Sequence, residues 1–192
     1  TLHLTPFEMV VKDANVYSVM PSYNEVDGIP AHANDFLLNQ VLRKEWGFEG
    51  YVFSDYGSVS HLYNFHHIAK DKQEAARQAV SAGVDLEAAR SHIYPVLVEL
   101  VKEGKLSEEL IDKAVRRILT VKFKAGLFEK AYAEPKNVSK IIHTPEHISL
   151  AQQIAEESIV LLKNENELLP FDKKTLKSLA VIGPNADQVQ YG

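Results

Sequence analysis

A carboxylate that directly follows an apolar run is the group in this sequence best placed for chemistry. Residues 51–53 are β-branched or aromatic and lie between Gly50 and Gly57, which is typical of a short buried strand. Asp55 follows that run. Enzymes built on parallel strands place catalytic groups at the carboxyl ends of strands, because a strand is rigid and its end opens onto the pocket. The structural alternative is that Asp55 caps the next helix or turn.

Three histidines downstream of this aspartate suggest a metal site, because imidazole is a common metal ligand. They are His61, His66 and His67. His66 and His67 are adjacent and cannot both face one ion from a helix, and no Asp or Glu lies at a familiar ligand spacing. We therefore favour packing or a place at the edge of the pocket for His66, and we expect no metal and no other cofactor.

The elements that must position these residues alternate between strands and helices along residues 1–125. The predicted helices are long enough to connect parallel strands, so the pattern predicts an α/β fold. An eight-stranded barrel needs about 250 residues, so we expect either the last part of a (β/α)8-type barrel or a smaller open sheet. Strands are predicted at 16–20, 51–53 and 83–87, helices at 4–14, 34–46, 72–82, 94–103 and 107–123, and a short helix or irregular loop at 58–67.

A change of composition separates this part from the rest of the chain. Residues 126–145 lack steady periodicity and contain Pro135 and Pro145, which predicts an ordered linker. A helix at 145–157, an apolar run at 159–164 and a strand at 179–184 then predict the beginning of a second α/β domain. Because Thr1 lies within a helical pattern and the second domain is incomplete, we expect the sequence to be a fragment.

The overall composition limits the classes of partner. The 192 residues are 45% hydrophobic and 24% charged, ordinary values for a soluble globular protein. The net charge of -5 gives no reason to expect binding to nucleic acid or to an anionic membrane surface. The sequence has no cysteine, which excludes disulfides and thiolate nucleophiles. No apolar run is long enough to span a membrane, and the first residues carry no export signal.

An ordered series of longer motifs is similar to glycoside hydrolase family 3 over nearly the whole chain. A Ser-Asp dipeptide alone would carry no weight, whereas a series of motifs in the family's order is a specific signal. The motifs lie at 19–24, 27–30 with Asn34, 42–48, 54–56, 82–85, 122–123, 126–128, 157–164, 168–170 and 181–186.

The resemblance implies a β-glucosidase or β-xylosidase type of enzyme, with a barrel-like domain followed by an α/β sandwich domain. The expected division is the C-terminal part of the barrel domain at 1–125, a linker at 126–145 and the start of the sandwich domain at 146–192. In the family, the aspartate of the Ser-Asp-Trp/Tyr motif is the nucleophile, and the matching residue is Asp55. An ionised carboxylate suits this role, because retaining hydrolysis traps the sugar as a covalent ester.

Four further residues are carried over as candidates for binding the sugar. Tyr23 matches a family tyrosine placed near the nucleophile and the sugar, with a core tyrosine as the alternative. Met20 matches a residue of the same subsite, although Met often only packs. Tyr56 replaces the commoner tryptophan, which leaves the choice of substrate open. Glu87 is a candidate contact to a sugar hydroxyl, with a carboxylate at a helix entry as the alternative.

A retaining glycosidase also needs a second carboxyl group as acid and base. In two-domain members of the family this glutamate lies in the sandwich domain, which would place it beyond Gly192. Glu25 and Asp27 are near in sequence only and fit loop residues better. We therefore assign no acid/base residue and expect residues 1–192 alone to be inactive.

The expected substrate is an oligosaccharide or glycoside, cleaved at its non-reducing end by a periplasmic or secreted protein. The oligomeric state is left open, with a homodimer as one alternative. The sequence does not distinguish specificity for glucose from specificity for xylose. Two rival hypotheses are a non-catalytic carbohydrate-binding or scaffold relative, which the presence of Asp55 argues against, and a single-domain relative acting on amino sugars, which the predicted second domain argues against.

Overall fold

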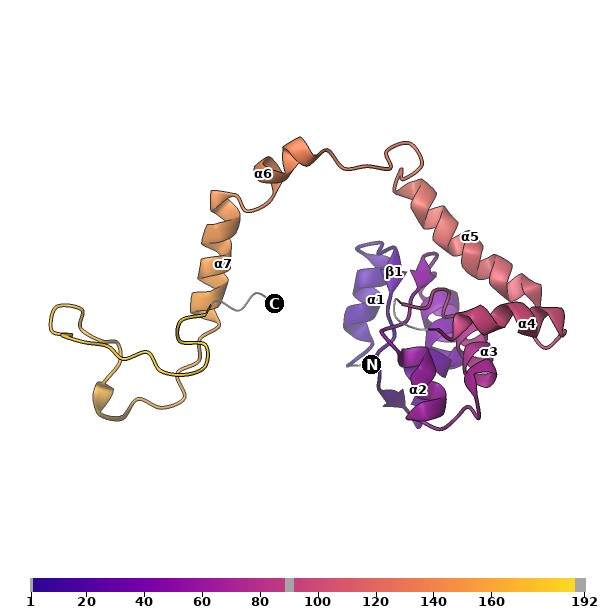
Figure 1. Cartoon of the computed structure of the whole chain (residues 1–192), viewed down its shortest axis with the longest axis horizontal. Helices are drawn as coiled ribbons and strands as arrows, with labels where there is room; N and C mark the ends of the chain where they lie inside the picture. The colour runs from indigo at the N-terminus through magenta and orange to yellow at the C-terminus, as the bar shows by residue number, and fades with distance from the viewer. Residues whose placement is uncertain (1, 89–91, 189–192) are drawn as a thin grey trace. The chain divides into compact units, whose positions relative to one another are not determined.

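The computed structural model describes residues 2–88 and 92–188. The chain forms two compact units, Thr1–Ala133 and Glu134–Gly192, and each is described by itself. The larger unit is mixed α/β and contains two small sheets (Figure 1).

A short parallel sheet lies at the centre of the larger unit. β1 (Ser18–Val19) pairs in parallel with β4 (Tyr51–Val52), with Ser18 opposite Tyr51 and Val19 opposite Val52. Phe53 forms a further parallel bridge to Leu86. Residues 51–53 therefore lie between β1 and Leu86, and the predicted parallel direction is confirmed. The strand predicted at 83–87 is reduced to the single bridge at Leu86.

A β-hairpin that the sequence analysis did not predict follows β1. β2 (Glu25–Val26) pairs antiparallel with β3 (Ile29–Pro30). The two residues between them, Asp27 and Gly28, have φ angles of 53° and 75°. An Asp-Gly pair with both φ angles positive is the preferred tight connection of a hairpin, because its twist matches that of the strands.

Helices cover the parallel strands as predicted. After a 3-10 turn η1 (Ala31–Ala33), the helix expected at 34–46 is observed as a π-helix η2 (Phe36–Glu45), and the Asn34 side chain accepts the Leu37 N–H at 3.0 Å. The 58–67 region contains α2 (Ser58–Asn64). Helix α1 (Thr5–Lys12) is shorter than the predicted 4–14, and only Val11 in it is buried.

Helix α3 (Lys72–Ala82) fits its prediction most closely. The Asp71 side chain accepts the Glu74 N–H at 2.8 Å and so begins the helix, and Gly83 ends it with a φ of 102°. Four small or β-branched residues at helical spacing, Ala75, Ala76, Ala79 and Val80, are all buried. Alanines on this face allow the helix backbone to pack closely against its neighbours.

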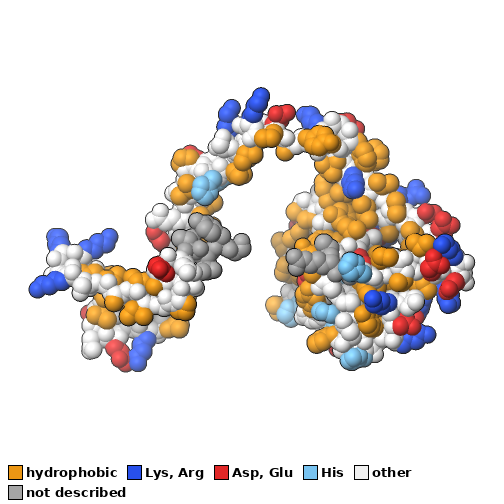
Figure 2. All heavy atoms as spheres, in the orientation of Figure 1, with side chains coloured by type: hydrophobic (Ala, Val, Ile, Leu, Met, Phe, Trp, Pro, Cys, Tyr) orange, Lys and Arg blue, Asp and Glu red, His pale blue; other side chains and the backbone are white. Residues whose placement is uncertain are grey.

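The C-terminal part of the larger unit is helical. The helix predicted at 94–103 consists of a 3-10 turn η3 (Tyr94–Val96) and α4 (Leu97–Lys102), and α5 (Glu108–Lys124) follows. Several apolar side chains of α5 are exposed, and Figure 2 shows apolar side chains on the visible surfaces of both units. The most exposed in α5 are Val115, Leu119 and Phe123.

A buried ion cluster links four elements of the larger unit. The Asp85 side chain, which is 2% exposed, accepts hydrogen bonds from Arg43 at 2.6 Å and from Arg117 at 2.7 Å. Its Oδ2 also accepts the Val52 N–H at 2.8 Å. The cluster therefore joins the segment after α3 to η2, α5 and the central strand β4.

The smaller unit contains short helices and α7 (Pro145–Glu157), which confirms the helix predicted at 145–157. The other elements are η4 (Pro135–Asn137), α6 (Val138–Ile141) and η5 (Glu165–Glu167). The strand predicted at 179–184 is wrong, because no strand is present in residues 134–188. An apolar run becomes a strand only where another strand pairs with its backbone, and Ile182 is 91% exposed. The three-part domain division stays a prediction.

Candidate active site

Asp55 lies just beyond the central strand and is held largely through backbone groups. Its N–H donates to Nε2 of His32 at 3.3 Å, and its carbonyl accepts the Ser54 hydroxyl at 2.9 Å. Its carboxylate oxygen Oδ1 accepts the Tyr56 N–H at 2.7 Å. The side chain is partly exposed, so the aspartate is fixed in position and still accessible to solvent.

Ser54 connects this aspartate to the neighbouring strand segment. The serine is fully buried, and its hydroxyl oxygen accepts the Ala88 N–H at 2.9 Å while its hydrogen goes to the Asp55 carbonyl. The Ser54 N–H in turn donates to the Leu86 carbonyl at 2.8 Å. The peptide that precedes Asp55 is thereby tied to residues 86–88.

Tyr23 approaches Asp55 from the end of the other neighbouring strand. Its hydroxyl donates to the Tyr56 carbonyl at 2.8 Å. The pKa of Tyr23 is raised, first by desolvation and then by hydrogen bonding to the Asp55 carboxylate and by its negative charge. The structure thus brings Tyr23 and Asp55 together.

The remaining sugar-binding candidates differ in what they contact. Met20 and Tyr56 are 45% and 62% exposed, so both side chains are accessible. Met20 lies three residues before Tyr23, and Tyr56 directly follows Asp55. The Glu87 carboxylate instead accepts the N–H of Tyr94 at 2.8 Å and that of Ile93 at 3.1 and 3.2 Å. These contacts are those of a carboxylate at the entry of helix η3, the alternative raised for Glu87.

The three histidines of the metal hypothesis make other contacts. The His61 ring lies 5.4 Å from that of Tyr23, centroid to centroid, and His66 pairs with Glu25 at 2.7 Å. Nδ1 of His67 lies 3.1 Å from the Tyr63 carbonyl. Within residues 2–88 and 92–188, no three His, Cys, Asp or Glu side chains form a group that could hold a metal ion.

His32 contacts the candidate site, and the sequence did not indicate it. It is 2% exposed and lies in the turn η1, directly after the hairpin. Burial lowers its pKa to about 4, against the opposing effect of the nearby Asp55 charge, so the imidazole is neutral at ordinary pH. Its only sequence signal is a polar residue between two alanines after a turn, which no motif distinguishes.

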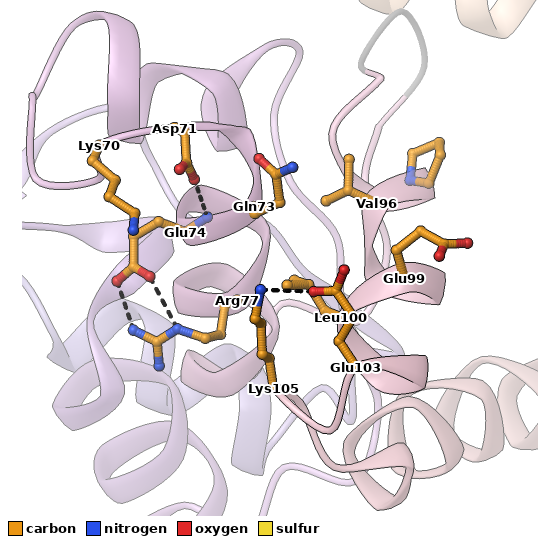
Figure 3. Close-up of a pocket in the computed structure, with 11 residues that line it drawn as sticks. Lys70, Asp71, Gln73, Glu74, Arg77, Val96, Glu99, Leu100, Glu103 and Lys105 are labelled. Carbon is orange, nitrogen blue, oxygen red and sulfur yellow. Dashed lines mark hydrogen bonds and ion pairs between the residues drawn. The ribbon is translucent and has the colours of Figure 1, made fainter.

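A hollow of about 810 Å³ lies between α3 and α4, away from Asp55 (Figure 3). Its walls carry charges of both signs, with ion pairs at Arg77–Glu74 (2.6 Å) and Lys105–Glu103 (2.7 Å). None of the predicted site residues lines it. The lining residues are Lys70, Asp71, Gln73, Glu74, Arg77, Pro95, Val96, Glu99, Leu100, Glu103 and Lys105.

In the part of the chain that the structure describes, no helix combines the length and apolar character needed to cross a lipid bilayer.

Comparison with protein families gives two matches in order along the chain. Residues 1–121 match the Glycosyl hydrolase family 3 N terminal domain. Residues 159–192 match the Glycosyl hydrolase family 3 C-terminal domain.

Known relatives include both xylosidases and glucosidases by name. A putative beta-xylosidase of Formosa agariphila is 40% identical over 93% of this chain, which is 24% of that protein. A periplasmic beta-glucosidase of Salmonella typhimurium is 39% identical over 91% of this chain and 23% of its own length. The crystal structure of a beta-glucosidase from Listeria innocua in complex with glucose has a TM-score of 0.74 and 41% identity, covering 86% of this chain and 22% of that one. The chain therefore spans about a quarter of the length of its relatives.

Proposed function

The chain belongs to glycoside hydrolase family 3, and on that premise we propose that it supplies the nucleophile of a retaining, exo-acting β-glycosidase. Asp55 is the proposed nucleophile. The observation that carries the proposal is a partly exposed carboxylate at the end of the central strand, with the hydroxyl of Tyr23 beside it. A rigid, accessible carboxylate of this kind is what attack on an anomeric carbon requires.

In the proposed reaction, an Asp55 carboxylate oxygen bonds to the anomeric carbon as the glycosidic C–O bond breaks. The leaving oxygen takes a proton from a second carboxyl group, which retaining enzymes hold about 5–5.5 Å from the first. The same group, now ionised, removes a proton from water, and the water oxygen displaces Asp55 from the sugar. We assign no residue of 2–188 to this second role.

For the sugar subsite we propose Tyr23, Met20 and Tyr56. Tyr23 contributes a hydroxyl beside the nucleophile, and Tyr56 an exposed ring suited to stacking on a sugar face. Glu87 is left out of the direct contacts, because its carboxylate is bonded to the start of η3. The three parallel segments support the proposal that 1–125 is the C-terminal part of a barrel domain, with a linker at 126–145 and the start of a sandwich domain after it.

The proposed substrate is an oligosaccharide with a terminal β-linked glucose or xylose, because the named relatives include both activities. We also propose a periplasmic or secreted location, which the name of the Salmonella relative supports.

The test is covalent trapping of a sugar on the enzyme. It uses the full-length protein, of a length comparable to that of the relatives. A 2-deoxy-2-fluoro glucoside or xyloside with a good leaving group should add one sugar to the peptide that contains Asp55, as detected by mass spectrometry. The Asp55→Asn variant should remain unlabelled and should turn over nitrophenyl glycosides at least about 10³-fold more slowly, as expected when a covalent nucleophile is lost. A label on another carboxylate would contradict the assignment, and sugar binding without turnover would indicate a non-catalytic relative.

A further inference from the structure

The ends of the two paired strands are bridged by one buried side chain. β1 leads into Ser22, and β4 leads into Asp55. His32 lies between these segments, accepting the Asp55 N–H at Nε2 and bonding to the backbone of Ser22 on its other side. Its own turn is anchored by the Ala31 N–H, which donates to the Asn24 carbonyl at 3.0 Å.

The protonation state of this histidine fits its two contacts. A neutral imidazole has one nitrogen that donates and one that accepts, and the partner groups fix which is which. The Asp55 N–H can only donate, so Nε2 must be the acceptor and Nδ1 must carry the proton. A charged imidazolium would have no acceptor for Asp55. The low pKa of His32, caused mainly by burial, keeps it in the required form.

We propose that His32 is a positioning residue for the nucleophile, a neutral imidazole that holds the Asp55 N–H and the Ser22 backbone in fixed relation. The inference rests on the proposed function of Asp55. It adds a role for a residue that does not touch the substrate. Through Ser22 the same imidazole positions the adjacent Tyr23, so the nucleophile and its phenolic neighbour are aligned by one side chain.

The Asp55 peptide is held from two sides, and the sides are not equivalent. On the carbonyl side, the Ser54 hydroxyl is itself tied to the Ala88 N–H. On the amide side, His32 is the partner of the Asp55 N–H. Removing the acceptor leaves that N–H unpaired beside a buried site, which favours rotation of the peptide and displaces the carboxylate.

Two substitutions separate the contacts of the imidazole. In His32→Gln, the amide oxygen can occupy the position of Nε2 and still accept the Asp55 N–H. In His32→Asn, the shorter amide reaches the position of Nδ1 and can still donate to Ser22, but it offers Asp55 no acceptor. Comparing the two distinguishes alignment of Asp55 from general packing of the turn.

The experiment measures the rate constant and the apparent binding constant for trapping by the 2-deoxy-2-fluoro glycoside, in the full-length protein and both variants, together with the thermal unfolding midpoint. We expect His32→Asn to slow the trapping step about tenfold or more, with binding within about threefold, because a donor has lost its acceptor. His32→Gln should trap within about threefold of the unsubstituted protein.

The outcomes separate this inference from the proposed function. A label on Asp55 that forms at an unchanged rate in His32→Asn would overturn the positioning role alone, as would equal losses in both variants. A label on another carboxylate in the unsubstituted protein would overturn the proposed function and this role together. If His32→Asn does not fold, the His32→Gln variant provides the test. Trapping that is tenfold slower in a folded His32→Gln protein would also reject the inference.

Discussion

At the scale of single residues, the candidate site depends on the pairing of Tyr23 with Asp55. The two come from the ends of adjacent parallel strands. A tyrosine phenol is neutral at ordinary pH, and desolvation and the nearby Asp55 carboxylate raise the pKa of Tyr23 further. A neutral phenol can donate a hydrogen bond, whereas a phenolate would repel the Asp55 carboxylate. Tyr23 should therefore matter for rate more than for folding.

Replacing Tyr23 by Phe should lower kcat/KM up to about tenfold, because it removes the hydrogen bond to the Tyr56 carbonyl beside Asp55, and such a bond is worth about 0.5–1.5 kcal/mol. The loss should appear mainly in kcat if the hydroxyl acts on the nucleophile during attack. Tyr17→Phe is a suitable control, since that tyrosine is also about half-exposed but precedes β1. Steady-state kinetics with nitrophenyl glycosides would show this, and equal effects of the two changes would argue against a specific role.

Asp55 became a candidate through its position after a strand, and the resemblance to the family marked it as the expected nucleophile. Tyr23 came only from the resemblance to the family. His32 was missed, because a single histidine between alanines forms no motif and its partners lie 10 and 23 positions away. Contacts of this kind depend on how the strand ends meet, which local sequence does not encode.

At the scale of elements, the ion cluster around Asp85 fixes the central strand. Three segments that are distant in sequence supply Arg43, Arg117 and the Val52 N–H to one carboxylate. Arg43 also donates to the Gly50 carbonyl at 3.1 Å, just before β4. Removing one member of a buried ion cluster is costly, because the remaining charges lose their compensation.

Asp85→Asn should destabilise the protein by about 3 kcal/mol, since it leaves Arg43, which is 10% exposed, without its counter-charge. Arg117→Met should cost less, because that side chain is 27% exposed. Arg77→Met removes an exposed pair with Glu74 and should cost under about 1 kcal/mol. Thermal unfolding midpoints would rank the three variants, and a loss in Arg77→Met as large as that in Asp85→Asn would contradict this account.

The elements themselves were predictable to different degrees. Helix α3 was clear, because its small and apolar residues recur at helical spacing, and the observed cap and terminal glycine agree with the predicted bounds. The hairpin β2–β3 was missed although Asp27-Gly28 is a hairpin signal, since its strands are only two residues each. The strand expected at 179–184 failed because apolar composition indicates burial but says nothing of a pairing partner.

At the scale of the whole molecule, acid should reduce stability through His32. The unfolded chain binds a proton at an ordinary histidine pKa of about 6.5, whereas the folded pKa is about 4. Between these two pKa values the unfolded state binds more protons than the folded state. The free energy of unfolding is therefore not reduced by His32 above about pH 6.5, and it decreases as the pH drops towards 4. The groups that act on His32 are Asp55, which opposes the shift, and His61 and His66, which add to it.

The difference between the folded and unfolded pKa of His32 should lower the free energy of unfolding by about 3 kcal/mol at pH 4. The thermal unfolding midpoint of the full-length protein should therefore decrease more between pH 7 and pH 4.5 than the midpoint of the His32→Gln variant. That variant has no titrating group at this position. Asp55→Asn should slightly steepen the decrease, because it removes the opposing charge. Parallel pH profiles for the unsubstituted protein and His32→Gln would show that the histidine does not set the acid sensitivity.

The way in which Asp55 is anchored has a consequence for the evolution of specificity. Its amide and carbonyl are secured by inward-facing groups of His32 and Ser54, not by the outward-facing side chains of Met20 and Tyr56. Under the proposed function, exchanges at those two outer positions could retune the choice between hexose and pentose while the reacting oxygen keeps its coordinates. Divergence in sugar preference within one scaffold would then require no redesign of its catalytic machinery.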